Sequence, residues 1–186
     1  EFKTDFQSLV EYWVGTEQLV YALMDYPEVV EDTLVTMWEV SRKCVEFSAA
    51  SEAKVFTTYE DTSTTNISPA YYEQYILPQI NEWCDILHKN DKLYLQHACG
   101  HLKDLMSLMA GSGIDGIESI SPPPTGNIEL WQARALLPDD KVLIGGIEPA
   151  IFSKLTPEEL KKYSVKLIDK MKGSRFVLAN SDSCPP

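Results

Sequence analysis

The sequence lacks several features that would assign it at once to a class of protein. No apolar run approaches the roughly 20 residues that a transmembrane helix needs, and no signal peptide opens the chain. Basic residues are few: 16 Lys and Arg stand against 28 Asp and Glu, the net charge is −12, and no basic stripe forms. Counterion release therefore cannot drive strong binding to nucleic acid, and anionic membranes are disfavoured for the same reason. We expect a cytoplasmic protein that binds neither.

Cysteine is also sparse, and no two cysteines form a close pair. Cys44 and Cys84 fall within helical patterns, and Cys184 lies 85 positions after Cys99. Without a C-x-x-C spacing, neither a zinc finger nor a disulfide framework is indicated. We expect four free thiols in a reducing compartment.

What the chain does contain is enough apolar sequence for one domain. Its 186 residues are 44% hydrophobic and include nine tyrosines, a composition typical of a globular protein. We find no internal repeat, low-complexity tract or hinge, and we expect residues 1–186 to form a single domain.

Hydrophobic periodicity predicts two helices followed by alternating strands and helices. The first two helices span residues 5–24 and 28–50, with a break at Asp25-Tyr26-Pro27. Five later segments rich in β-branched or apolar residues predict strands, and the segments between them predict helices. The strands are 54–59, 93–99, 113–120, 141–147 and 175–180, and the helices are 69–88, 101–111, 128–137 and 156–172.

Strands separated by single helices predict right-handed βαβ units and a parallel sheet. Two architectures fit this α/β pattern: a doubly wound sheet, or part of a TIM (β/α)₈ barrel. A complete barrel has eight strands and about 250 residues, so the barrel interpretation makes this chain a fragment with about five β/α units. The chain also opens within a predicted connecting helix and ends soon after its last strand, which favours the fragment.

The strand at 93–99 ends with two side chains that are able to bind a metal. His97 and Cys99 are two positions apart and would project from the same face of the strand, and Gly100 then ends it. Cys184 follows the last strand, so in either architecture it lies on the same rim, and Glu118 follows the neighbouring strand. Imidazole and thiolate suit Zn²⁺ better than Mg²⁺ or Ca²⁺. The alternative is that His97 and Cys99 are ordinary half-buried residues.

Three protein ligands would leave an exchangeable zinc position for a substrate. A thiol substrate bound there would be deprotonated and become a nucleophile. The pattern therefore indicates a catalytic rather than a structural zinc site.

Several segments resemble one known family. HACG at 97–100, GIDGIESISPPPTGN at 113–127, GGIEP at 145–149 and the late Cys184 resemble the C-terminal half of the uroporphyrinogen decarboxylase family. YEDTSTTNISPAYYEQYILP at 59–78 is similar as well. The resemblance is greatest to the corrinoid-dependent methyltransferase branch, and it covers the chain from about residue 55 to its end, and more weakly the helices before.

This resemblance implies the last five strands of a barrel and a set of site residues. It implies that His97, Cys99 and Cys184 are zinc ligands. A coenzyme M-like or homocysteine-like thiol would accept a methyl group from a methylated corrinoid carried by a partner protein. Glu118 would be a further zinc ligand or a carboxylate that supports one of the ligands. Asp61, with Glu60, would line the mouth of the site. We predict catalytic roles for Glu118 and Asp61.

Three alternatives stay open. The decarboxylase branch acts without metal and uses arginines to bind a porphyrinogen with many carboxylates, but Arg42, Arg134 and Arg175 are isolated here. The second alternative is a non-catalytic barrel-fragment binding domain, and the third is an α/β domain without metal. Because an incomplete barrel leaves two sheet edges unpaired, we also expect self-association or dependence on a further segment.

Overall fold

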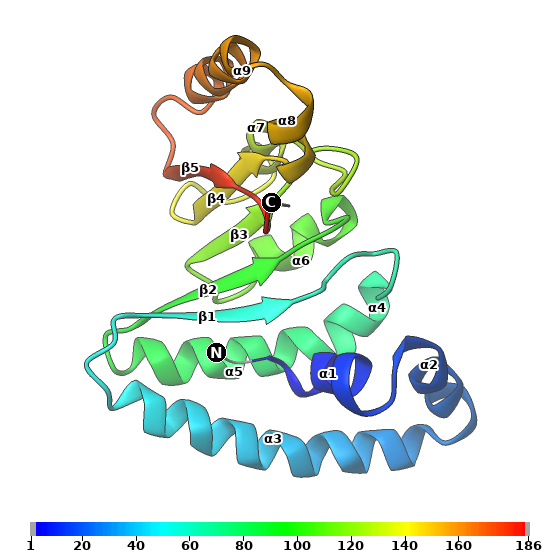
Figure 1. The fold of residues 1–186 in the computed structure, drawn as a ribbon. Helices are drawn as coiled ribbons and strands as arrows, with labels where there is room; N and C mark the ends of the chain where they lie inside the picture. Colours follow the sequence, from blue (N-terminus) through cyan, green and yellow to red (C-terminus); the bar gives the residue numbers. More distant parts are fainter. Residues whose placement is uncertain (1–2, 185–186) are drawn as a thin grey trace.

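The computed structural model of the chain describes residues 3–184, and its centre is a five-stranded β-sheet (Figure 1). The strands are β1 (Val55–Glu60), β2 (Leu93–Ala98), β3 (Gly116–Ile120), β4 (Val142–Ile147) and β5 (Phe176–Asn180). All four pairings are parallel, and the strands lie side by side in the order of the sequence. The five predicted strands and the α/β class are confirmed.

This strand order decides between the two architectures. A doubly wound sheet reverses its strand order at a switch point, whereas strands of a (β/α)₈ barrel follow one another in sequence order. The order β1-β2-β3-β4-β5 contains no reversal. Among the described residues, β1 and β5 each pair on one side only. The sheet therefore has the topology of a barrel segment.

One face of the sheet is covered and the other is open. Alternate residues of β2, such as Tyr94 and Gln96, are fully buried, whereas Leu93 on the opposite face is 49% exposed. Val55 of β1 and Val177 of β5 are similarly exposed. Parallel sheets normally have both faces covered. The open apolar face is the one that a closed barrel would hold inside.

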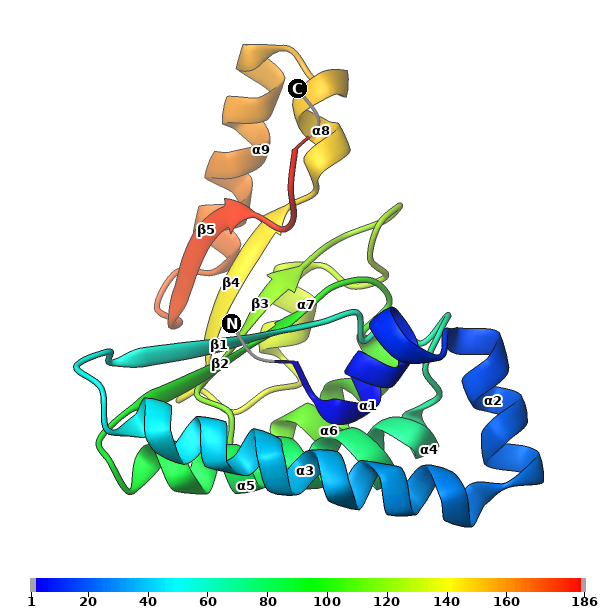
Figure 2. The ribbon, with the colours of Figure 1, turned by 60° about the horizontal axis from the view of Figure 1, so that its bottom comes forward.

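Helices surround the covered face and the two ends of the sheet. Figures 1 and 2 show α3 alongside α5 next to β1 and β2, with α8 and α9 beside β4 and β5.

None of the helices in residues 3–184 is both long and apolar enough to cross a membrane. The helical segments are α1 (Asp5–Ser8), η1 (Leu9–Trp13), α2 (Thr16–Asp25), α3 (Pro27–Ala49), α4 (Pro69–Tyr71), η2 (Tyr72–Ile76), α5 (Leu77–His88), η3 (Lys103–Leu105), α6 (Met106–Ala110), α7 (Leu130–Arg134), α8 (Pro149–Lys154) and α9 (Pro157–Lys170).

The single helix predicted over 5–24 is wrong, because the chain breaks at Gly15. The π-helix η1, which continues α1, ends at Trp13, and α2 begins directly after Gly15, whose φ is 86°. A positive φ is readily adopted by glycine and ends a helix. The predicted break before Pro27 is confirmed: Pro27 opens α3, whose buried residues include Val30, Leu34 and Val45.

The long helix predicted over 69–88 exists but changes its winding. Its first turns, α4, pass into the π-helix η2 before α5 continues to His88. Pro78 explains this change, because proline lacks an N–H and its ring clashes with the carbonyl four residues earlier in a regular α-helix. Apolar residues three or four positions apart form the inward face of this helix, and each of them is at most 1% exposed: Tyr72, Ile76, Ile80, Trp83 and Leu87.

Other differences concern short helices. The predicted helix 101–111 is a 3₁₀ turn followed by α6, and 128–137 contains only the five residues of α7. Helix α8 was not predicted, because its six residues are too few to display a helical period. A capping box opens α9, whose helix was predicted from residue 156: Glu159 N–H donates to Thr156 Oγ1, and Thr156 N–H donates to Glu159 Oε2.

Candidate metal centre

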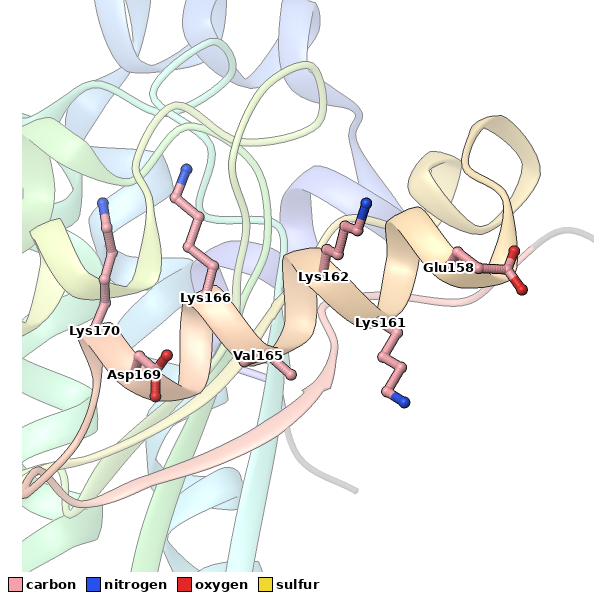
Figure 3. A pocket seen from close by; sticks show the side chains of 7 residues that line it. All are labelled: Glu158, Lys161, Lys162, Val165, Lys166, Asp169 and Lys170. Atoms are coloured by element: carbon pink, nitrogen blue, oxygen red, sulfur yellow. The ribbon is translucent and has the colours of Figure 1, made fainter.

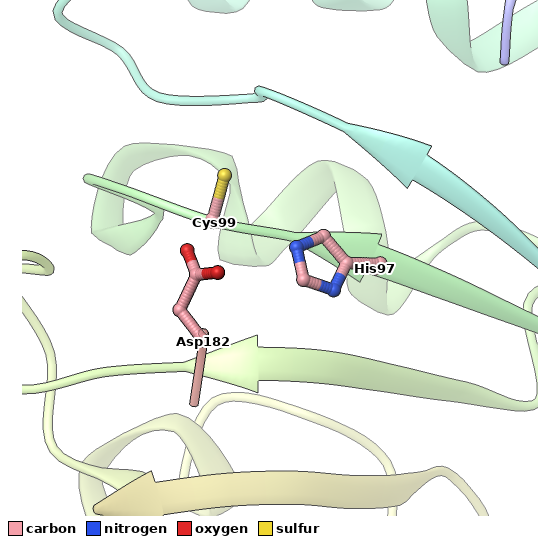
Figure 4. A group of neighbouring side chains, drawn as sticks. All are labelled: His97, Cys99 and Asp182. Atoms are coloured by element: carbon pink, nitrogen blue, oxygen red, sulfur yellow. The ribbon is translucent and has the colours of Figure 1, made fainter. Parts of the chain in front are cut away.

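Three side chains converge at the carboxyl end of the sheet. His97 lies at the end of β2, Cys99 directly follows that strand, and Asp182 lies in the loop after β5. Each offers one possible ligand atom, and these atoms all lie within 4.8 Å of one another. Figure 4 shows the Asp182 carboxylate directed toward Cys99 and His97. Nitrogen, sulfur and oxygen donors are thus brought together across 85 positions of sequence.

The His97 ring is held from both neighbouring strands. His97 is the register partner of Tyr59 in β1 and of Glu118 in β3. Its ring centroid is 5.0 Å from that of Tyr59, and its Nδ1 lies 3.0 Å from Glu118 Oε2. This hydrogen bond is the main reason that the Glu118 pKa is below its usual range. When Nδ1–H donates to Glu118, Nε2 is left with its lone pair free to bind a metal.

Cys99 lies in surroundings that oppose its ionisation. Its Sγ is 3.7 Å from the backbone oxygen of Glu60. Burial raises the pKa of the thiol to about 11, and nearby Asp61 and Asp182 contribute in the same direction. A thiol in this environment stays protonated at neutral pH unless a cation binds beside it.

Gly100 turns the chain away immediately after Cys99, as the sequence predicted. Its φ is 87°, and a Cβ atom at this position would lie 2.4 Å from Cβ of Ser63. Ser63 Oγ in turn accepts a hydrogen bond of 3.0 Å from His101 N–H. The loop after β1 can therefore approach the end of β2 only because residue 100 has no side chain.

We expect Gly100→Ala to destabilise the chain by about 2 kcal/mol or more, because it adds both backbone strain and a clash. Urea unfolding would measure this change. Gly111→Ala is the matched control, since its nearest neighbour would be an ordinary 3.8 Å away. Equal effects of the two substitutions would contradict the explanation.

Asp182 lies beside His97 and Cys99, at the place where the sequence predicts Cys184. Cys184 is exposed, its Sγ lies 3.6 Å from Nδ2 of Asn180, and it is not in the converging group of described residues. Asp182 lies in the same loop, two positions earlier, and its place just after a strand was the available signal. The metal-binding role of Cys184 remains a prediction.

A cavity of about 450 Å³ opens beside the converging side chains. Glu60 and Asp61 both line it; Glu60 is 1% exposed, and burial raises its pKa to about 7. Thr4 donates to the Glu60 carboxylate from its N–H at 2.7 Å and from its hydroxyl at 2.8 Å. The catalytic roles of Asp61 and Glu118 remain predictions. The cavity lining is Lys3, Gln7, Val10, Glu11, Tyr59, Glu60, Asp61, His97, Cys99 and Asp182.

The N-terminal segment contributes to this cavity, which the sequence did not predict. Four of the lining residues come from positions 3–11, which precede β1 by more than 40 positions. Lys3 is an example: its Nζ lies 2.8 Å from Glu11 Oε2 and donates to the Tyr59 carbonyl at 3.2 Å. No local pattern marks these residues.

A larger hollow, of about 710 Å³, runs along α9 (Figure 3). Every residue that lines it belongs to this one helix, and Lys162, Lys166 and Lys170 extend from the same side. Lys170 Nζ lies 3.6 Å from the centre of the Trp131 ring, a cation–π contact. Because all of its lining residues come from one helix, we interpret this hollow as a solvated helix face.

Comparison with known proteins gives the same picture of the fold. The chain is 25% identical over 174 residues to methylcobamide:CoM methyltransferase MtbA of Methanosarcina acetivorans, an alignment that covers 84% of this chain. It superposes on a methyltransferase from Methanosarcina mazei with a TM-score of 0.71 and 13% identity over 96% of its length. The chain spans 43% of the first protein and 52% of the second. The predicted fold, a portion of a barrel preceded by helices, is thus confirmed.

The family assignment rests on a longer match. Residues 7–186 match the uroporphyrinogen decarboxylase (URO-D) family. This matched span contains the helical segment before β1 from residue 7 onward, as well as all five strands. The resemblance noted in the sequence therefore extends over nearly the whole chain. This chain is a member of the uroporphyrinogen decarboxylase family.

Proposed function

We propose that the chain is the zinc-binding part of a methyltransferase. It would act with a partner protein that carries a methylated corrinoid, and the methyl acceptor would be a small thiol resembling coenzyme M or homocysteine. The observation that carries this proposal is the convergence of His97, Cys99 and Asp182 within 4.8 Å beside a cavity. The similarity to a methylcobamide:CoM methyltransferase supports it.

The donor set fits zinc. Zn²⁺ is borderline in softness and accepts imidazole nitrogen, thiolate sulfur and carboxylate oxygen together. Two anionic donors, from Cys99 and Asp182, would balance the charge of the ion. A bound zinc ion would supply Lewis acidity that lowers the pKa of a thiol, so that the acceptor is a thiolate at neutral pH.

The protein's own residues would orient this site. Glu118 accepts the hydrogen bond from His97 Nδ1, which fixes the ring and directs Nε2 toward the other two donors. Asn66 Nδ2 donates to Asp61 at 2.8 Å, which keeps that carboxylate at the cavity wall. We propose that Asp61 and Glu118 serve the reaction in these positioning roles.

The charge of the cavity favours methyl transfer over decarboxylation of a porphyrinogen. All three arginines of the chain lie in the described part, and none lines the cavity. Arg42 lies 3.8 Å from Glu82, and Arg134 donates to the carbonyls of Leu137 and Lys141. A substrate with many carboxylates would need cationic partners, which these residues do not supply.

The test is the zinc content of the purified chain, measured by elemental analysis. We expect about one zinc per chain, and we expect His97→Ala and Cys99→Ser to lose it because each removes a direct ligand. Cys44→Ser is the matched control, since Cys44 is an exposed thiol on α3. A chain without zinc after reconstitution, or variants that retain it, would overturn the proposal.

Cobalt substitution separates the catalytic function from a purely structural one. Cobalt(II) in the same site has visible absorption that responds to ligand exchange. We expect 2-mercaptoethanol to change this spectrum, because an exchangeable position admits a thiol. A loaded chain whose spectrum does not respond would instead support a non-catalytic metal-binding domain.

A further inference from the structure

One residue of β3 has a backbone conformation that is rare for its type. Ser119 has φ of 79°. The register between β3 and β4 shifts between Glu118 and Ile120, which makes Ser119 the extra residue of a β-bulge. Bulges next to functional sites redirect side chains. Because glycine adopts a positive φ at lower cost than serine, the Ser119 side chain needs an explanation.

The Ser119 hydroxyl connects β3 to the loop after β5. Ser119 is 1% exposed, and its Oγ donates a hydrogen bond to the backbone oxygen of Ser181. Ser181 is held from other sides as well: its N–H donates to Ile147 O at 2.8 Å, and its hydroxyl donates to Ser121 Oγ at 2.9 Å. The backbone that leads into Asp182 is therefore fixed by buried hydrogen bonds.

Ser119 thereby acts on two members of the candidate metal centre. Glu118, the preceding residue, accepts the hydrogen bond from His97, and the bulge begins directly after it. Asp182, on the other side, follows the residue whose carbonyl Ser119 binds. Ser119 is the one residue of β3 that carries a hydroxyl group.

We propose that Ser119 is a positioning residue. Its strained backbone places Glu118 within hydrogen-bonding distance of His97 Nδ1, and its hydroxyl places the Asp182 carboxylate beside Cys99. This inference rests on the proposed zinc site. It explains why a serine occupies a position that glycine would fill with less strain: glycine would permit the bulge but would remove the hydrogen bond from residue 119 to the Ser181 backbone oxygen.

The test compares Ser119→Gly and Ser119→Ala in the full chain by zinc competition with a chelator, by the cobalt(II) spectrum and by urea unfolding without metal. We expect both variants to bind zinc about tenfold more weakly, the loss typical of residues that support a ligand. Their stabilities should differ, because glycine relieves the backbone strain and alanine does not. We also expect an altered cobalt spectrum in both.

Ser112→Gly is the matched control. The Ser112 hydroxyl is also buried and donates to a carbonyl, that of Met109 at 2.7 Å, but it lies before β3, at the opposite end of the sheet from Asp182. We expect lower stability with unchanged zinc affinity. If the parent binds zinc and Ser119→Gly has the same affinity and spectrum, the inference alone is overturned. If the parent binds no zinc, the proposed site fails and the inference fails with it.

Discussion

Asp182→Asn is expected to lower the affinity of the chain for zinc more than about 100-fold, because it replaces an anionic ligand by a neutral one. Changes to residues that only support a ligand cost about 10- to 100-fold, so the loss of a direct ligand should exceed that range. The Asp182 carboxylate belongs to the group whose ligand atoms lie within 4.8 Å of one another, whereas Cys184 does not. Cys184→Ser should therefore weaken zinc binding much less.

Competition with a chromogenic chelator measures both affinities. Asp139→Asn is the control, because this carboxylate is fully exposed and 4.0 Å from its partner Arg134. If Cys184→Ser abolishes binding and Asp182→Asn does not, the ligand set inferred from the sequence is correct. The loop after β5 would then have to bring the Cys184 thiol to the place where Asp182 lies in this structure.

The buried Glu60 carboxyl is expected to make the stability of the chain depend strongly on pH. Burial raises the pKa of this carboxyl from 4.5 to about 7, so the folded chain holds the proton more tightly than the unfolded chain. The contribution of Glu60 to stability is therefore fully present below about pH 4.5 and is lost as the pH rises toward 7. By this linkage the parent should lose up to about 3 kcal/mol over that range from Glu60 alone.

Glu60→Gln should remove this component of the pH dependence. The amide oxygen of glutamine can still accept the bond from Thr4 N–H, and its NH₂ group can donate to the Thr4 hydroxyl. Urea unfolding of metal-free parent and variant at pH 5 and pH 8 measures the difference. The variant should be the more stable of the two at pH 8, and parallel pH profiles would show that Glu60 is ionised in the folded chain. Asp5, whose pKa burial also raises, contributes equally to both profiles.

Local patterns identified most of the secondary structure. The five strands and the inward face of α5 depend on side chains two, three or four positions apart, and such spacing is visible in a sequence. The capping box at Thr156 is a similar case, because its two partners are three residues apart. The π-helix at Tyr72–Ile76 could in principle have been inferred from Pro78, but the exact winding depends on how the helix packs.

Two of the three converging side chains could also be predicted from local sequence. His97 and Cys99 are on one strand, so their common direction follows from the alternation of side chains along β2. Glu118 was placed correctly beside them, because parallel strands end at the same edge and β3 is next in the chain. The donor types of His97 and Cys99 indicated zinc. The family resemblance added the expectation of a methylated corrinoid as methyl donor and of a particular class of thiol acceptor.

Which side chain of the loop after β5 lies beside His97 and Cys99 is visible in the tertiary structure alone. Asp182 and Cys184 are both in the loop after β5, and no periodicity tells which one turns toward Cys99. That choice depends on the conformation of the loop, which buried hydrogen bonds from Ser119 and Ser121 hold in place across about 60 positions of sequence. The N-terminal residues of the cavity are a similar case, since Thr4 reaches Glu60 only through folding. Contacts of this range are decided by the packing of whole elements, and no local pattern in the sequence records them.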